Sequence, residues 1–172
     1  MFPPLVAAMI SLGVLGAIDT YVTATLIPVP VWVTFIAWAS FFACGGEKTG
    51  YIKSIASNFT GIIIASITLL IIEIGPSAPL FAAILVGAGT SAMVFASGTK
   101  LLDFPPAIVF GFASLVGTTA ATQTTITGAE ALTHPTLIAM LAMVVGASFG
   151  FVSEIVTKLL SAGQTAEAQP NT

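Results

Sequence analysis

One acidic residue, Asp19, lies inside the first long apolar segment of this sequence, which runs from about Leu5 to Ile27. A helix would place it about 12 Å from the nearer end of that segment. A carboxylate at such depth in a membrane is costly unless it faces water, a cation or hydrogen-bond donors, so Asp19 is a candidate for solute or ion contact. Two simpler interpretations stay open: the helix ends before Asp19, or the acid is protonated or bonded by Thr20 and Thr23.

Aromatic side chains gather in the next apolar segment, Val31 to Cys44. Rings such as Trp38 and Phe41 offer faces on which a flat, weakly polar or cationic solute stacks, and Phe112 holds a similar place in a later short segment. Packing against lipid, or anchoring at the membrane surface, is the simpler role for these rings, and the sequence favours it.

Two polar residues, Asn58 and Thr118, complete the candidates for solute contact. Asn58 lies among small residues at helical spacing, which let helices approach closely in lipid, and its amide can bond a solute or a neighbouring helix. Thr118 belongs to a hydroxyl-rich stretch whose oxygens could replace water around a solute. For residues 123–127 a loop outside the membrane is the better interpretation. The stripe Ala83, Gly87 and Ser91 predicts helix packing.

Residue sets for catalysis or metal binding are missing from the sequence. One cysteine, Cys44, and one histidine, His134, build neither a disulfide nor a zinc or copper site. His134 precedes Pro135 and is predicted to begin a helix. The formal charge of −3 excludes the basic stripe of a nucleic-acid-binding groove. We therefore predict no enzymatic activity, no cofactor, no metal and no nucleic-acid partner.

The composition predicts a membrane protein. Hydrophobic residues make up 56% of the 172 residues and charged residues only 6%, with a mean hydropathy of +1.07. A soluble domain carries about 25% charged residues. We expect one all-α domain over residues 1–162 with six transmembrane helices, at approximately 5–27, 31–44, 51–74, 79–96, 101–118 and 137–160. The polar residues 163–172 are predicted to form a disordered cytoplasmic tail.

The four lysines orient these helices. If all six segments cross the bilayer, every lysine falls on one side, and the positive-inside rule places that side in the cytoplasm with both termini. Two segments, 31–44 and 101–118, are short for a hydrocarbon core of about 30 Å. Re-entrant loops at both would move three lysines outside, so we prefer six crossings. The lysines are Lys48, Lys53, Lys100 and Lys158.

Each half of the chain contains a long, a short and a long segment, and prolines stand at the start of each short one. Residues 35–42 resemble residues 109–116, because an aromatic residue, Ala-Ser and two bulky apolar residues recur 74 positions later. Three crossings separate the copies, so the two short helices would run in opposite directions, as in inverted-repeat transport proteins. A chance match between segments rich in Ala, Ser and Phe is the alternative.

Two apolar motifs carry a resemblance to a known family. The motifs are Trp32-x-x-Phe35-x-x-x-x-x-Phe41-x-Ala43-Cys44-Gly45-Gly46 and Phe104-x-Pro106 followed by Gly111. With them the chain, apart from its polar tail, resembles the YcdZ-like family of small bacterial inner-membrane proteins. The resemblance implies a multi-pass protein of the bacterial inner membrane. It implies no substrate or catalytic residue, because that family is a domain of unknown function.

These features favour a channel or transporter for a small, polar, uncharged solute, with its path between the two short helices. The alternative is a non-transporting accessory or assembly subunit of the membrane. Six short crossings make a small pore, so we also expect a homo-oligomer in the lipid bilayer. The residues expected near the path are Asp19, Trp38, Phe41, Asn58, Phe112 and Thr118.

Overall fold

The computed structural model describes residues 2–162, and this part of the chain is helical without strands. The predicted tail at 163–172 lies outside the described residues. The helices are α1 (Pro4–Thr25), α2 (Val31–Ala43), α3 (Glu47–Ile74), α4 (Pro79–Ala96), α5 (Pro105–Thr122), the 3-10 helix η1 (Ala131–Thr133) and α6 (Pro135–Ser161).

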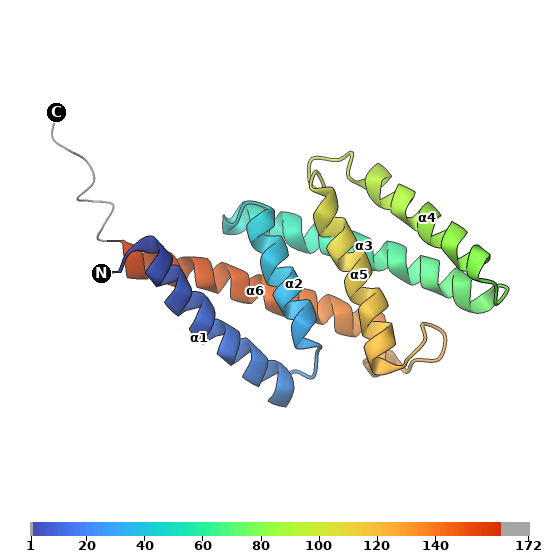
Figure 1. The fold of residues 1–172 in the computed structure, drawn as a ribbon, viewed down its shortest axis with the longest axis horizontal. Helices are drawn as coiled ribbons and strands as arrows, with labels where there is room; N and C mark the ends of the chain where they lie inside the picture. Colours follow the sequence, from blue (N-terminus) through green and yellow to red (C-terminus); the bar gives the residue numbers. More distant parts are fainter. Residues whose placement is uncertain (1, 163–172) are drawn as a thin grey trace.

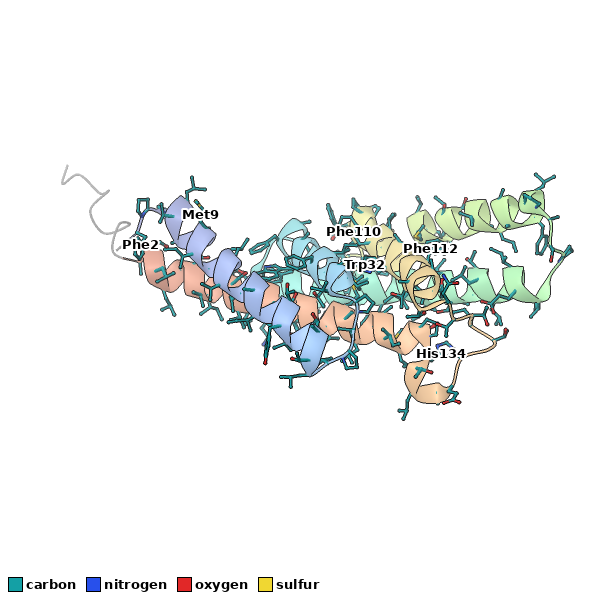
Figure 2. All side chains as sticks on the ribbon, turned by 60° about the horizontal axis from the view of Figure 1, so that its bottom comes forward. Phe2, Met9, Trp32, Phe110, Phe112 and His134 are labelled. Atoms are coloured by element: carbon teal, nitrogen blue, oxygen red, sulfur yellow. The ribbon has the colours of Figure 1, made fainter. Side chains whose placement is uncertain are left out.

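Five of the six α-helices are long and apolar enough to cross a membrane, and α2 is the exception. It has 13 residues, which make about 20 Å of helix. Large apolar side chains stand out from the helices all around the molecule (Figure 2), and Phe95 is 89% exposed. Such a surface is stable in lipid and not in water. The expectation of an all-helical, membrane-type protein is confirmed.

Prolines set where several helices begin. Pro79 and Pro135 occupy the first position of α4 and α6, where a helix needs no N–H from that residue. Pro105 does the same for α5, which therefore begins there and not at residue 101.

Two other helix bounds differ from the expected ones. Helix α5 continues to Thr122 and not to residue 118, so the first hydroxyls of the polar stretch are helical. The third helix begins at Glu47, earlier than the expected residue 51.

One end of the molecule joins segments that are far apart in sequence, and we name it the lysine end. The backbone N–H of Phe2 donates to the Leu160 carbonyl at 3.1 Å, which ties the start of α1 to the end of α6. The backbone N–H of Glu47 donates to Glu154 Oε2 at 2.7 Å, at the tight turn between α2 and α3. The α4–α5 loop joins this end through an ion pair, because Asp103 lies 2.8 Å from Lys53.

The opposite end, which we name the Glu73 end, joins the other three connections. Near the end of α3, the Glu73 carboxylate accepts hydrogen bonds from the backbone N–H groups of Ile126 and Thr127, at 2.7 and 2.9 Å. The α1–α2 loop lies beside this region, since Val29 and Leu137 line a common pocket. The connections between successive helices therefore alternate between the two ends (Figure 1).

Two helices in the middle of the molecule, α2 and α5, each cross a long helix (Figure 1). Only α2 is short, because α5 has 18 residues, as many as α4, and the expectation of a second short segment is wrong. Where α2 crosses α6, a Cβ added at Gly146 would lie 2.0 Å from the Thr34 carbonyl oxygen. Where α5 crosses α3, a Cβ at Gly61 would lie 1.8 Å from the Ile108 carbonyl oxygen. Glycine thus lets the backbones touch at both crossings. The hydrophobic core around the crossings includes Val33, Ala37, Ile62, Ala65, Leu115, Ala139 and Met143.

Alanine at either crossing should force the helices apart. We expect Gly61→Ala and Gly146→Ala each to lower the free energy of unfolding by about 1–3 kcal/mol or to prevent folding, because the added methyl group overlaps a backbone carbonyl. The measurement is thermal unfolding of the purified protein in detergent. Gly87→Ala is the matched control, since a Cβ there meets nothing within 4 Å. Equal unfolding temperatures for the three variants would contradict the close crossings.

Candidate functional site

The short helix α2 carries three buried polar side chains, and each one hydrogen-bonds a different neighbouring helix. They are Thr34, Trp38 and Ser40, whose partners lie on α1, α6 and α3 respectively. We call these three contacts the α2 junction. A helix with so apolar a sequence forms in lipid without help, but its few polar groups must find partners inside the protein. They therefore determine which helices α2 joins.

Asp19 lies at the contact with α1 and is 0% exposed. Its Oδ2 lies 2.5 Å from Thr34 Oγ1, and its Oδ1 has no hydrogen-bond partner among the described residues. The helix continues past Asp19 to Thr25, so the interpretation that it ends earlier is wrong. The hydroxyl of Thr23 donates to the backbone carbonyl of Asp19 at 2.7 Å and leaves the carboxyl group to α2.

Asn58 lies at the contact with α3, in a closed ring of hydrogen bonds. Ser40 Oγ donates to Asn58 Oδ1 at 3.1 Å, Ser54 Oγ donates to Ser40 Oγ at 2.9 Å, and Asn58 Nδ2 donates to Ser54 Oγ at 3.3 Å. All three side chains are fully buried. Of the two roles that the sequence leaves open, the amide in this structure bonds a neighbouring helix.

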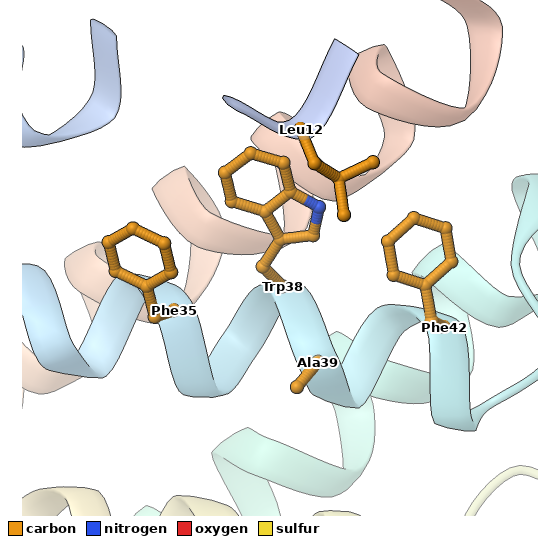
Figure 3. Close-up of a pocket in the computed structure, with 5 residues that line it drawn as sticks. All are labelled: Leu12, Phe35, Trp38, Ala39 and Phe42. Carbon is orange, nitrogen blue, oxygen red and sulfur yellow. The ribbon is translucent and has the colours of Figure 1, made fainter. Parts of the chain in front are cut away.

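Trp38 lies at the contact with α6, where its indole N–H donates to Ser153 Oγ at 3.0 Å. One face of its ring stacks on Phe35, with ring centroids 5.9 Å apart. A pocket of about 270 Å³ lies here, between α1 and α2. Figure 3 shows the side chains that line it. Its lining is almost entirely apolar, and consists of Leu12, Phe35, Trp38, Ala39 and Phe42.

Phe41 is fully buried, and its ring packs over Gly150 of α6. This contact makes it part of the core, as the simpler interpretation of the aromatic run predicts. The rings of Phe35 and Phe42 on α2 are more exposed, and the ring of Trp32 packs over Gly117 of α5. Only part of the aromatic run is therefore available to a solute in this conformation.

The two remaining candidates, Phe112 and Thr118, belong to α5. Phe112 is half-buried and lies close to Gly89, at the contact between α5 and α4. The Thr118 hydroxyl donates to the Ser114 carbonyl of its own helix at 2.7 Å. Neither residue joins the hydrogen bonds of the α2 junction. The structure thus brings Asp19, Trp38, Phe41 and Asn58 together around α2, and places Phe112 and Thr118 on α5.

The partners of these residues are what sequence reasoning missed. Thr34, Ser40, Ser54 and Ser153 look like ordinary small polar residues of apolar helices. The one feature of the sequence that could have indicated these partners is the expected burial of Asp19 and Asn58. A buried hydrogen-bond acceptor needs a donor nearby, and a buried donor needs an acceptor. The prediction for His134 is confirmed, because its Nδ1 accepts from the Thr136 N–H at the start of α6.

A comparison with protein families identifies the chain. A family model described as "Protein of unknown function (DUF1097)" matches residues 9–158, which include the whole α2 junction. The chain belongs to the DUF1097 family. No curated protein matches it, and no solved structure matches it. The match to DUF1097 leaves the YcdZ-like name a prediction, and it supplies no substrate.

The hydrogen-bonded ring in this DUF1097 protein gives a stability prediction. We expect Asn58→Ala to lower the free energy of unfolding by about 1–3 kcal/mol, because it leaves Ser40 and Ser54 buried with an incomplete set of partners. Denaturation by SDS in mixed micelles measures the change. Thr60→Ala is the control on the same helix, because Thr60 bonds only the carbonyl of Ala56 in its own helix. An equal loss in both variants would show that the ring adds nothing specific.

Proposed function

We propose that this DUF1097 protein is a channel or transporter for a small, polar, uncharged solute in the bacterial inner membrane, and that its two halves form a 3+3 inverted repeat. The observation that carries the proposal is the pair of central helices, α2 and α5, which run in opposite directions through the middle of the molecule (Figure 1). Inverted repeats with short central helices are a common design of transport proteins.

The glycine crossings support the repeat. Thr34 and Ile108 are 74 positions apart, the same offset that relates the two short segments in the sequence. Each presents its carbonyl oxygen to a glycine of a long helix, Thr34 to Gly146 and Ile108 to Gly61. Each of these two helices thus crosses the third helix of the other half at a glycine. This shared contact supports the repeat over a chance match of apolar sequences.

A second pair of contacts agrees with the same correspondence. Trp38 and Phe112 are also 74 positions apart. Trp38 donates to Ser153 of α6, and Phe112 lies at Gly89 together with Thr68 of α3. An aromatic residue of each central helix therefore approaches a hydroxyl-bearing residue of the opposite long helix. The repeat places α2 and α5 on either side of its axis, where inverted-repeat proteins hold their solute.

The distribution of charge supports an uncharged solute and sets the orientation. All four lysines lie in the segments of the lysine end, which the positive-inside rule assigns to the cytoplasm together with both termini. Glu73 holds the loop at the opposite end. A pocket of about 410 Å³ lies there, with Glu73, Thr119, Gln123, Thr124 and Thr125 in its lining. Hydroxyl and amide groups at that mouth suit a polar solute without charge.

A path between the halves requires α2 to move. Asp19 and Asn58 line none of the described pockets, because they are bonded to α2. Separation of α2 from α1 and α3 would expose the Asp19 carboxyl group, the Asn58 amide and the serines of the ring together. The proposal therefore assigns this structure to a closed conformation.

Solute entry into proteoliposomes tests the proposal. We expect stopped-flow light scattering to show that water, urea, glycerol or a short amide enters vesicles containing the protein faster than empty vesicles. Asn58→Leu should reduce the rate of solute entry, because it replaces the amide on the path with an apolar group. The control variant Thr60→Val should leave the rate of solute entry unchanged. Rates equal to those of empty vesicles for every solute, with insertion verified, would overturn the proposal.

A second function, a non-transporting accessory or assembly subunit, is favoured by one face of α4. The stripe Ala83, Gly87 and Ser91, whose spacing predicts helix packing, is exposed in the described chain. A Cβ at Gly87 meets nothing within 4 Å. Small residues on an outer helix face let another helix approach closely, from a second copy or from a different protein.

Crosslinking in native membranes separates the two functions. A homo-oligomer linked through Gly87→Cys fits the channel and the expected self-association. A stoichiometric partner of another kind, linked at the same position, fits the accessory subunit. Gly13→Cys on α1 is the control for random encounters, since a Cβ there also meets nothing within 4 Å.

A further inference from the structure

The contact between Asp19 and α2 has one hydrogen too few when the carboxyl group is ionised. Thr34 Oγ1 lies 2.5 Å from Asp19 Oδ2 and 2.7 Å from the Val31 carbonyl oxygen. Both distances are those of hydrogen bonds, but a threonine hydroxyl carries one hydrogen. With Asp19 ionised, Thr34 donates to one of these oxygens and faces the other without a hydrogen between them.

A proton on Asp19 resolves the contact. The acid O–H then donates to Thr34 Oγ1, and the Thr34 hydroxyl donates to the Val31 carbonyl oxygen. Each short distance now holds one hydrogen, in a chain that runs from α1 into the first turn of α2. An O–H donor to an oxygen acceptor gives the shortest hydrogen bonds found in proteins, which suits the 2.5 Å contact.

The surroundings of the carboxyl group also favour its neutral form. Asp19 is 0% exposed and its Oδ1 has no partner. A carbonyl oxygen without a donor costs far less in an apolar interior than an anionic oxygen without one. The backbone of α1 uses its own N–H groups within the helix. Nothing described around Asp19 therefore compensates a negative charge.

The charged and titratable groups of the packed helices lie elsewhere. Helix α2 carries none between Val31 and Ala43. On α6, Glu154 and Lys158 pair with each other and with Glu47 at the lysine end. His134, at the start of α6, bonds Thr136 and lies 3.2 Å from the Ile126 carbonyl oxygen. No described cation faces Asp19.

The second half of the chain lacks this pair. In the proposed repeat Thr34 corresponds to Ile108, which is buried and apolar. Helix α4 carries no acidic residue. The packing of α4 on α5 therefore needs no carboxyl group, which supports a role for Asp19 beyond packing.

We propose that Asp19 is a proton-binding site, which holds its proton while α2 is packed on α1 and exchanges it when α2 moves away. The proton would then link the position of α2 to pH. This inference deepens the proposed function, because it supplies the control of a path between the halves. The site itself is defined by the Asp19–Thr34–Val31 contact and does not depend on any flux.

Infrared spectroscopy detects the proton directly. At neutral pH we expect the carbonyl stretch of a protonated carboxylic acid in the purified protein, shifted by H/D exchange and missing in Asp19→Asn. Asparagine keeps the contact, because its amide N–H donates to Thr34 in place of the acid. Absence of the band from the wild-type protein, or its persistence in Asp19→Asn, would overturn the proposal.

Stability against pH gives a second measurement. The folded state binds one more proton than the unfolded state above the ordinary pKa of aspartate, about 3.9, so stability falls as pH rises. We expect the folding equilibrium constant of the wild-type protein to fall about tenfold per pH unit relative to Asp19→Asn, until the folded protein also loses the proton. Parallel pH profiles for the two proteins would contradict the site.

Two controls keep these tests decisive. If Asp19→Asn does not fold, Thr34→Val carries the infrared test, because loss of the hydroxyl should shift the acid band, and an unmoved band would overturn the contact. Both readouts are independent of transport. If no solute enters the proteoliposomes but the infrared band of the protonated acid is present, the proposed function alone is overturned. If a solute enters but the band is missing, the proton site alone is overturned.

Discussion

Close contact between helix backbones is the constraint on which the rest of this structure depends. Lipid removes the hydrophobic force that drives helices together in water, so contact area and buried hydrogen bonds must hold them. Gly61 and Gly146 provide the contact area, since a carbonyl oxygen of α5 lies against Gly61 and one of α2 against Gly146. Helices α2 and α5 can then lie deep between the long helices, and the polar side chains of α2 come within hydrogen-bonding distance of three neighbouring helices.

Those polar side chains give α2 a different character from α5. Both helices cross a long helix at a glycine, but α2 also bonds α1, α3 and α6 through Thr34, Ser40 and Trp38. On α5 the buried Thr118 hydroxyl bonds its own helix, and the buried Ser114 hydroxyl has no hydrogen-bond partner among the described residues. The two helices thus share the glycine crossing and differ in chemistry. In the proposed repeat, this difference makes the α2 junction the polar site of the pair.

Sequence patterns located the helices better than they located the contacts. Proline positions and apolar length predict α4 at 79–96 as observed, because those signals are local. The beginning of α5 was misplaced because apolar residues precede Pro105, and apolarity alone does not distinguish a helix from a buried loop. For Asp19 the sequence suggested Thr20 and Thr23 as partners, whereas the observed partner, Thr34, lies on the next helix. Spacing also fails to tell which face of a helix meets protein, as the outward stripe of α4 shows.

The small length of α2 has a consequence for the membrane around it. Its 13 residues cover about 20 Å, and its outer face, with Phe35 and Phe42, is exposed toward the surroundings. In the proposed arrangement of six crossings, a hydrocarbon core of about 30 Å exceeds that length, so the bilayer thins beside α2 or the helix tilts less than its neighbours. Longer acyl chains would increase this hydrophobic mismatch and pull on the helix that holds the polar junction. The thickness of the bilayer therefore determines how strong a force the mismatch exerts on α2.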